Sequence, residues 1–166
     1  NDTNQNLTAY NISSADIDGD SIKNIFNWKI NGVPIAVLNM PFEQLNGTGG
    51  VNGNALDYSG FRNNGSVSGA TWNATGGYDG KGAYMFQGND GAANYQRVTI
   101  PFSQSLNFSN RPYTISVWTN HRTARVNGDT AVSHGTSGNC IGFSVAYTNG
   151  NGNMGFTVYN SSVGNC

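Results

Sequence analysis

The carboxylates of this chain are few, and three of them are regularly spaced. Asp16, Asp18 and Asp20 occupy alternate positions, with Gly19 between the last two. In an extended segment this spacing directs three carboxylates to the same side, and crowded carboxylates favour a hard cation such as Ca²⁺. The segment lacks the later ligands of an EF-hand loop. A calcium site and a simple Asp/Gly turn therefore both remain open interpretations.

The residues that could support catalysis are sparse. Glu43 is the only glutamate, and His121 and His134 are the only histidines. Asp129 could complete a Ser/His/Asp triad by residue type alone. No serine lies in a motif that would place it on the strained turn between a strand and a helix that such nucleophiles occupy. The glycine-rich stretch 49–53 lacks the following helix and lysine of a phosphate-binding loop. We interpret the histidines as polar loop residues beside a strand and predict that the chain is not an enzyme.

Aromatic residues in loop-like stretches are the best candidates for ligand binding. Trp72, Tyr78 and Tyr95 lie among many asparagines. An exposed aromatic face beside amide hydrogen-bonding groups is what a sugar-binding platform needs. Loop aromatics also commonly cover a core, so this set is either a glycan-binding platform or part of the packing.

Two cysteines and eight glycosylation sequons indicate an extracellular setting. Cys140 and Cys166 flank the last two predicted strands, and we expect a disulfide between them. The Asn-X-Ser/Thr sequons exceed the roughly four or five that this composition gives by chance. Glycosylation and composition both remain explanations for them. The sequons begin at Asn1, Asn6, Asn11, Asn46, Asn64, Asn73, Asn107 and Asn160.

The overall composition excludes several classes of function. The chain has 166 residues, of which only 10% are charged, and a formal net charge of -1. Without a basic face, nucleic acids and anionic membrane surfaces are poor partners. Apolar runs are far shorter than the roughly 20 residues that span a bilayer. With its many aromatic, glycine, asparagine, serine and threonine residues, the chain fits a secreted, turn-rich, all-β protein.

The elements that must position these residues are predicted to be strands. Phe26, Trp28 and Ile30 alternate with polar residues, and Asn31-Gly32 then separates them from the apolar run 33–38. This pattern predicts a hairpin with a type I′ turn. Alternation elsewhere favours antiparallel sheets packed face to face. Further strands are expected over Ala83–Phe86, Arg97–Ile100, Tyr113–Trp118, Ile141–Tyr147 and Met154–Tyr159.

Five short motifs follow one another along the chain: Asp57-Tyr58-Ser59-Gly60, Asn63-Asn64-Gly65, the stretch 80–88, the stretch 98–101 and the stretch 113–118. In this order they resemble the LamG-like jelly-roll domains of the concanavalin A-like lectin/glucanase superfamily. The resemblance implies an antiparallel β-sandwich of jelly-roll type over residues 37–166, incomplete at its C-terminal end. In related domains a Ca²⁺ ion is held at the sandwich rim, which implies a second candidate site at Asp57, Asn89 and Asp90; a solvated turn is the equally open alternative. The paired carboxylates of glucanases on this fold have no counterpart among these residues.

The N-terminal part is similar to the last strands of an immunoglobulin-like or cadherin-like repeat. The similarity covers residues 1–36, with the segment 15–20 followed by the stretch 26–32. A complete immunoglobulin-like domain has about 100 residues. We therefore expect a chain clipped at both ends, whose apolar stripes are completed by the rest of a larger protein or by another copy.

Together these features predict a non-catalytic adhesion or binding module at the cell surface. It would contact glycan or protein through loop rims, with Ca²⁺ helping to order them. The alternative is a structural subunit of an extracellular filament or surface layer, assembled from copies by strand complementation. A weaker alternative is an accessory domain of a glycoside hydrolase. No nucleic-acid partner and no membrane insertion are expected.

Overall fold

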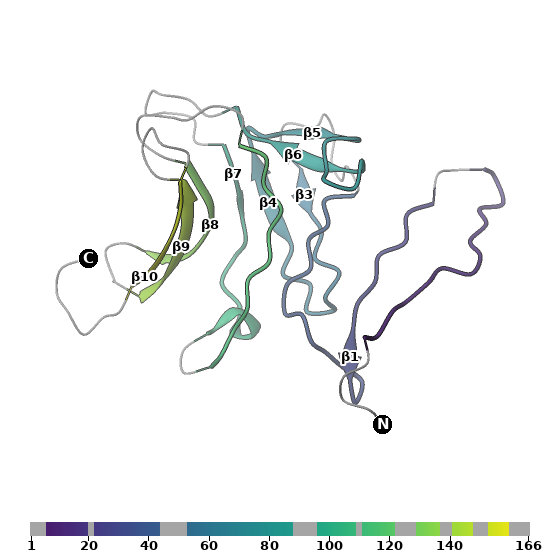
Figure 1. Cartoon of the computed structure of the whole chain (residues 1–166), viewed down its shortest axis with the longest axis horizontal. Coiled ribbons are helices and arrows are strands. Elements are labelled where there is room, and N and C mark those ends of the chain that lie inside the picture. The colour runs from purple at the N-terminus through teal and green to yellow at the C-terminus, as the bar shows by residue number, and fades with distance from the viewer. Residues whose placement is uncertain are drawn as a thin grey trace. The chain divides into compact units, whose positions relative to one another are not determined.

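The computed structural model is all-β and antiparallel, and it consists of two compact units (Figure 1). It describes residues 6–19, 22–43, 53–87, 96–108, 111–121, 129–136, 141–147 and 153–159. The first unit is Asn1–Tyr113 and the second is Thr114–Cys166. The only helical element among the described residues is the 3₁₀ turn η1 (Gln104–Leu106). The domain boundary expected near residue 36 falls inside the first unit.

A short hairpin is the first pair of strands in the described part of the chain. Strands β1 (Lys29–Ile30) and β2 (Val33–Pro34) pair antiparallel, with Ile30 opposite Val33. Asn31 and Gly32 have φ values of 52° and 81°. Two central residues with positive φ are the signature of a type I′ turn, whose twist matches that of the flanking strands. The predicted hairpin and its turn are therefore confirmed, with a shorter ladder than the sequence pattern indicates.

Gly32→Ala tests how strongly the turn is specified. A Cβ atom at Gly32 meets nothing within 4 Å, so only the backbone conformation opposes the substitution. Because an L-residue with a side chain resists positive φ, we expect the free energy of unfolding to fall by about 1 kcal/mol in urea titrations. The control Asn31→Gly keeps the required conformation and should have little effect. Equal stability of Gly32→Ala and the native chain would contradict this turn.

The core of the first unit is built from two small sheets. In one, the order is β3 (Asn54–Ala55), β4 (Gly65–Ser68), β7 (Arg97–Thr99); in the other, β5 (Thr71–Asn73) pairs with β6 (Ala83–Met85). Along β4, buried residues alternate with exposed serines, which is the pattern of a strand with one face on a core. The buried cluster consists of Ala55, Val67, Ala70 and Tyr84, with Met40, Phe42, Trp72 and Val98 packed against it.

The second unit contains one three-stranded sheet with the order β10–β9–β8 (Figure 1). Its strands are β8 (Asp129–Thr136), β9 (Ile141–Tyr147) and β10 (Met154–Tyr159). β9 and β10 pair without a break from Met154 opposite Tyr147 to Tyr159 opposite Gly142. The β8–β9 register shifts between Thr130 and Val132, which is the mark of a β-bulge.

Most of the predicted strands are confirmed, and one is wrong. β6 and β7 form within one residue of the expected bounds, and β9 and β10 form at the expected bounds. The strand expected over Tyr113–Trp118 is absent from the structure, although this segment is described throughout. Its residues alternate, but alternation produces a strand only where a neighbouring strand completes the ladder. No described helix is long and apolar enough to cross a bilayer.

Candidate functional site

Asp57 is the most heavily hydrogen-bonded carboxylate among the described residues, and it is only 8% exposed. Its Oδ1 atom accepts the backbone N–H groups of Asn39 and Ser59, each at 2.8 Å. Its Oδ2 atom accepts the Ser59 hydroxyl at 2.7 Å and the backbone N–H of Asn63 at 2.8 Å. Because a carboxylate offers about four lone-pair positions, these four donors fill them.

Asn63 extends this network to a distant part of the chain. Its side-chain amide donates to the Val37 carbonyl and to the Ser105 hydroxyl, both at 2.8 Å, and its Oδ1 accepts the Ser103 hydroxyl at 2.6 Å. The carboxylate thus organises the loop 57–63 against the chain that leads away from β2 and against η1. We call Asp57, Ser59 and Asn63 the loop lock.

Two opposing effects set the pKa of Asp57. Burial is the largest single effect and by itself raises the pKa, because it disfavours the charged form. The hydrogen bonds from Asn39, Ser59 and Asn63 together outweigh it, so that the pKa lies below its ordinary value of 3.8. The carboxylate is therefore held in its ionised form as an acceptor.

The hydrogen bonds of Asp57 do not fit its predicted role as a calcium ligand. A calcium ion takes six to eight oxygen ligands at about 2.3–2.6 Å, whereas each oxygen of Asp57 already accepts two hydrogen bonds. Asn89 and Asp90, the other predicted ligands, lie outside the described residues. The structure thus assigns Asp57 to holding its own loop.

The other predicted calcium segment forms a turn in its described part. The Asp18 N–H donates to Asp16 Oδ1 at 3.1 Å, and Gly19 follows with φ of 83°. This is the Asx-turn geometry of an Asp/Gly turn. Asp20 lies outside the described residues. No group of three acidic, histidine or cysteine side chains suited to a metal occurs among the residues that the structure describes.

Trp72, the first member of the predicted glycan platform, is engaged in packing. It is half-buried on β5, and its indole Nε1 donates to the Phe42 carbonyl at 2.8 Å. The Lys23 ammonium lies 5.6 Å from the centre of its ring. Tyr78 is 79% exposed, and Tyr95 lies outside the described residues. The predicted set is thus not brought together as an aromatic platform by the part of the chain that is described.

Glu43, the only glutamate, is buried and paired. Its Oε2 atom lies 3.4 Å from Lys23 Nζ and accepts the Gly82 N–H at 3.3 Å. Lys23 also donates to the Glu43 carbonyl at 2.7 Å. These contacts attach the segment before residue 44 to the start of β6, so that Glu43 holds two segments of the chain together.

A histidine–aspartate pair occurs at one end of the β8–β9–β10 sheet. His121 Nε2 lies 2.9 Å from Asp129 Oδ2, and the His121 ring stacks on Tyr147 at 4.1 Å between ring centres. Within the described ranges, no serine, threonine or cysteine side chain hydrogen-bonds to the His121 ring. A triad needs a nucleophile next to the histidine, and the pair instead joins the segment before β8 to the sheet.

The β9–β10 ladder carries a continuous apolar face. Tyr147, Val145 and Phe143 lie directly opposite Met154, Phe156 and Val158. Phe143 is buried and its ring lies 6.4 Å from that of Phe156, whereas the three β10 side chains are between 53% and 59% exposed. β10 is the end strand of this sheet. Its apolar face and its edge are thus both open in the described unit.

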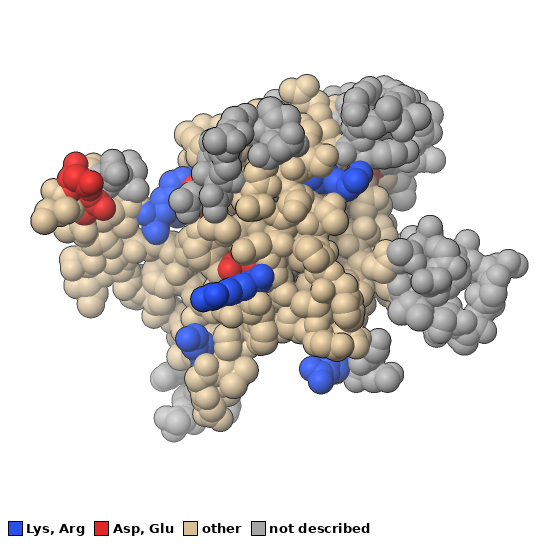
Figure 2. Space-filling view, turned by 180° about the vertical axis from the view of Figure 1, so that it is seen from behind, with Lys and Arg blue, Asp and Glu red and all other residues tan. Residues whose placement is uncertain are grey.

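Charged side chains of the described residues do not gather on the face shown in Figure 2. The face shown in Figure 2 carries scattered lysine and arginine side chains and few acidic ones. The chain as a whole has eight Lys and Arg residues against nine Asp and Glu residues. A nucleic-acid interface needs a basic patch or stripe, and none gathers on this face.

The described sequons differ in how they would accommodate a glycan. Asn6 and Asn11 are exposed, whereas the Asn73 side chain is half-buried and accepts the Thr75 N–H at 3.0 Å. Asn64 accepts the Asp57 N–H at 2.9 Å, and Asn107 is exposed. The remaining predicted sites, Asn1, Asn46 and Asn160 and the cysteines Cys140 and Cys166, lie outside the described residues.

Sequence reasoning missed the loop lock as a unit, although a signal for it exists. An aspartate two residues before a serine favours an Asx turn, in which the carboxylate accepts the following N–H. The partners from Asn39 and Asn63 are not visible in such a local pattern.

Comparison of the chain with known protein families, with curated proteins and with solved structures gives no match.

Proposed function

We propose that this chain is a non-catalytic binding module of an extracellular or cell-surface protein, and that it engages a protein strand through β10. The observation that carries the proposal is the open apolar face of an end strand. Met154, Phe156 and Val158 are each more than half exposed. An added strand would pair with the β10 backbone and place its own apolar side chains beside these on the same face, which is the binding mode of β-augmentation.

The apolar face favours a protein partner over a glycan. A sugar site needs an aromatic face with polar groups converging on it, and Trp72 already uses its indole N–H within the protein. The β10 face presents apolar side chains on a backbone edge, which suits an extended peptide with alternating apolar residues. Composition supports the extracellular location, and the exposed Asn6 and Asn11 leave room for glycans.

We also propose that the antiparallel sheets belong to a β-sandwich of LamG-like jelly-roll type. The support is the order of the five motifs and the confirmed strands β6, β7, β9 and β10. The first motif contributes Asp57 and Ser59 to the loop lock.

Phe156→Lys tests the binding proposal. The probe is a fluorescently labelled peptide of alternating valine and threonine with lysines at both ends, measured by anisotropy against the full chain. A charge in the centre of the apolar face removes a cross-strand apolar contact and places an ammonium group in the interface. We expect binding to weaken by about fivefold or more.

The matched control is Thr157→Lys. Thr157 is also exposed on β10, but it lies on the other face of the strand, opposite Ser144. The Thr157→Lys variant adds the same charge at the same distance from the probe's backbone. It should therefore bind the peptide as the native chain does. Absence of peptide binding to the native chain, or equal weakening by both lysines, would rule out the β10 face.

A further inference from the structure

The hairpin β1–β2 presents large apolar side chains to solvent on one face. Trp28 and Ile30 lie on one strand, and Val33 and Ile35 on the other, with Ile30 opposite Val33 and the Ile35 N–H donating to the Trp28 carbonyl. Phe26 continues the alternation. These five side chains are between 45% and 63% exposed. We call them the hairpin face.

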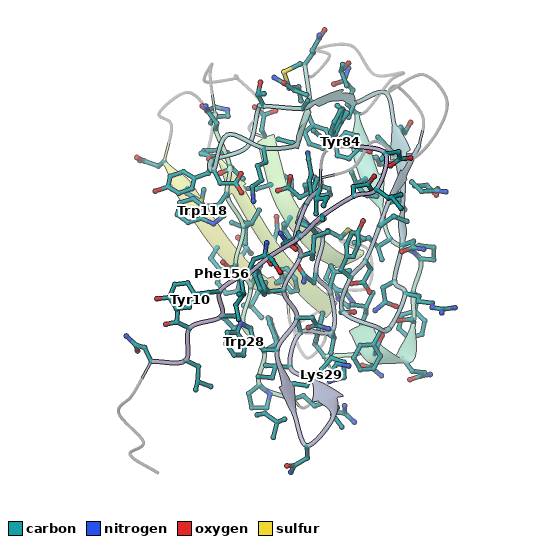
Figure 3. The ribbon with its side chains drawn as sticks, turned by 90° about the vertical axis from the view of Figure 1, so that its right-hand side faces the viewer. Tyr10, Trp28, Lys29, Tyr84, Trp118 and Phe156 are labelled. Atoms are coloured by element: carbon teal, nitrogen blue, oxygen red, sulfur yellow. The ribbon has the colours of Figure 1, made fainter. Side chains whose placement is uncertain are left out.

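The opposite side of the hairpin is attached to the first unit. The Asn27 amide donates to the Ser59 carbonyl at 2.7 Å, and Pro34 lies beside Gly60, where an added Cβ atom would be 3.5 Å from the proline ring. Trp28 and Lys29, neighbours along the chain, leave the hairpin on different sides (Figure 3). Polar and small residues thus face the loop lock, and large apolar residues face away.

The direction of the hairpin face is fixed by the turn. A one-residue slip between the strands would move every side chain to the other face, but the type I′ turn with Asn31 and Gly32 at positive φ sets the register. Single exposed apolar residues are common on proteins. Five adjacent ones on a fixed surface form a patch that marks an interaction site.

The area of this patch indicates the kind of partner. Large apolar side chains expose about 150–250 Å² each, so five at roughly half exposure present about 500 Å². Pairing of two such faces would bury about 1,000 Å², the lower limit for a specific protein–protein interface. The hairpin face holds no charged side chain and the whole chain has a net charge of only -1, so a second copy meets little electrostatic repulsion.

We propose that the hairpin face is a self-association surface that packs against the same face of a second copy about a two-fold axis. An uncharged apolar face is its own complement, which is what a two-fold interface requires. Interfaces at this lower size limit are typical of weak, transient complexes, so we expect a dissociation constant on the order of 100 μM. The hairpin face and the β10 face share no residue, and the two proposals are independent.

The test is sedimentation equilibrium of the full chain from about 10 μM to about 1 mM. The native chain is expected to shift from monomer to dimer over this range. The double variant Ile30→Lys/Val33→Lys places four like charges in the paired interface and should weaken dimerisation by about tenfold or more. Both side chains flank the turn and are more than half exposed, so the fold is retained and can be verified by circular dichroism.

Two control variants test whether dimerisation depends on the hairpin face. Ser66→Lys/Ser68→Lys adds the same charge at exposed positions of β4 and should leave dimerisation unchanged. Phe156→Lys should also leave it unchanged while it weakens binding of the strand peptide. A native chain that stays monomeric at about 1 mM, or a dimer lost in Phe156→Lys and kept in Ile30→Lys/Val33→Lys, would overturn the hairpin interface. Binding of the strand peptide at β10 is measured separately for each of these variants.

Discussion

Asp57→Asn is expected to lower the free energy of unfolding by about 3 kcal/mol or more, one of the two largest effects that we predict. The carboxylate accepts four hydrogen bonds in a buried loop. Hydrogen bonds to a charged group are worth about 1.5–3 kcal/mol each, and a buried donor left unpaired costs about 1–3 kcal/mol. An asparagine can accept at only one of the two oxygen positions, so its NH₂ group would face donors at the other.

The same variant should change the response of the protein to acid. Because the folded-state pKa of Asp57 lies below its ordinary value of 3.8, ionised Asp57 stabilises the fold at all pH values above that ordinary pKa. This stabilisation is lost as the pH falls from about 4 through the lower folded-state pKa. Urea titrations between about pH 7 and pH 2 should therefore show a steeper loss of stability for the native chain than for Asp57→Asn.

Asp79→Asn is the matched control for the loss of stability at neutral pH. Asp79 also accepts the N–H of the second following residue, Lys81, but its side chain is 51% exposed. Water can replace its hydrogen bonds, so the variant should unfold like the native chain. Equal destabilisation by the two asparagines, or an acid response of Asp57→Asn that matches the native chain, would show that the loop lock does not depend on the Asp57 charge.

The strands that could be predicted from the sequence are those whose pattern is complete within the strand itself. β9 and β10 each carry three or four apolar residues at alternate positions, and the Asn31-Gly32 turn is specified by its two residues. Local alternation and turn chemistry are sufficient in these cases. They also predict the all-β class, because no stretch has the apolar spacing of a helix.

β8 and the segment 113–118 show where local pattern is insufficient. β8 contains Ser133, His134 and Gly135, and its register shifts between Thr130 and Val132, so its sequence has no regular alternation. It is a strand because β9 supplies a pairing edge. The segment 113–118 does alternate, but it forms no strand in the structure. Strand formation therefore depends on a partner that a local pattern does not specify.

The candidate sites depend even more on contacts distant in sequence. The resemblance makes Asp57 a candidate calcium ligand, but it does not contain the hydrogen bond to Asn39, which spans 18 residues, or the link from Asn63 to Ser105, which spans 42. The alternation of Phe26, Trp28 and Ile30 and the turn after them are predicted from the sequence, but the exposure of these side chains is not. Which side of the hairpin faces the protein is set by Asn27, which donates to the Ser59 carbonyl, and no local pattern contains that contact.

Gly82→Ala is the second variant with a large expected effect. An added Cβ atom would overlap the Phe42 carbonyl oxygen and lie 3.0 Å from Glu43 Cα. These are backbone atoms, so no side-chain rotation can relieve the overlap, and the segment 42–43 must move away from the start of β6. That movement weakens the hydrogen bonds of Gly82 to Glu43 and of Trp72 to the Phe42 carbonyl. We expect a loss of about 3 kcal/mol in urea titrations, against about 1 kcal/mol for Gly32→Ala, where only backbone conformation is at stake. If the two alanines cost the same, the close approach of residues 42–43 to β6 is not a feature of the folded protein.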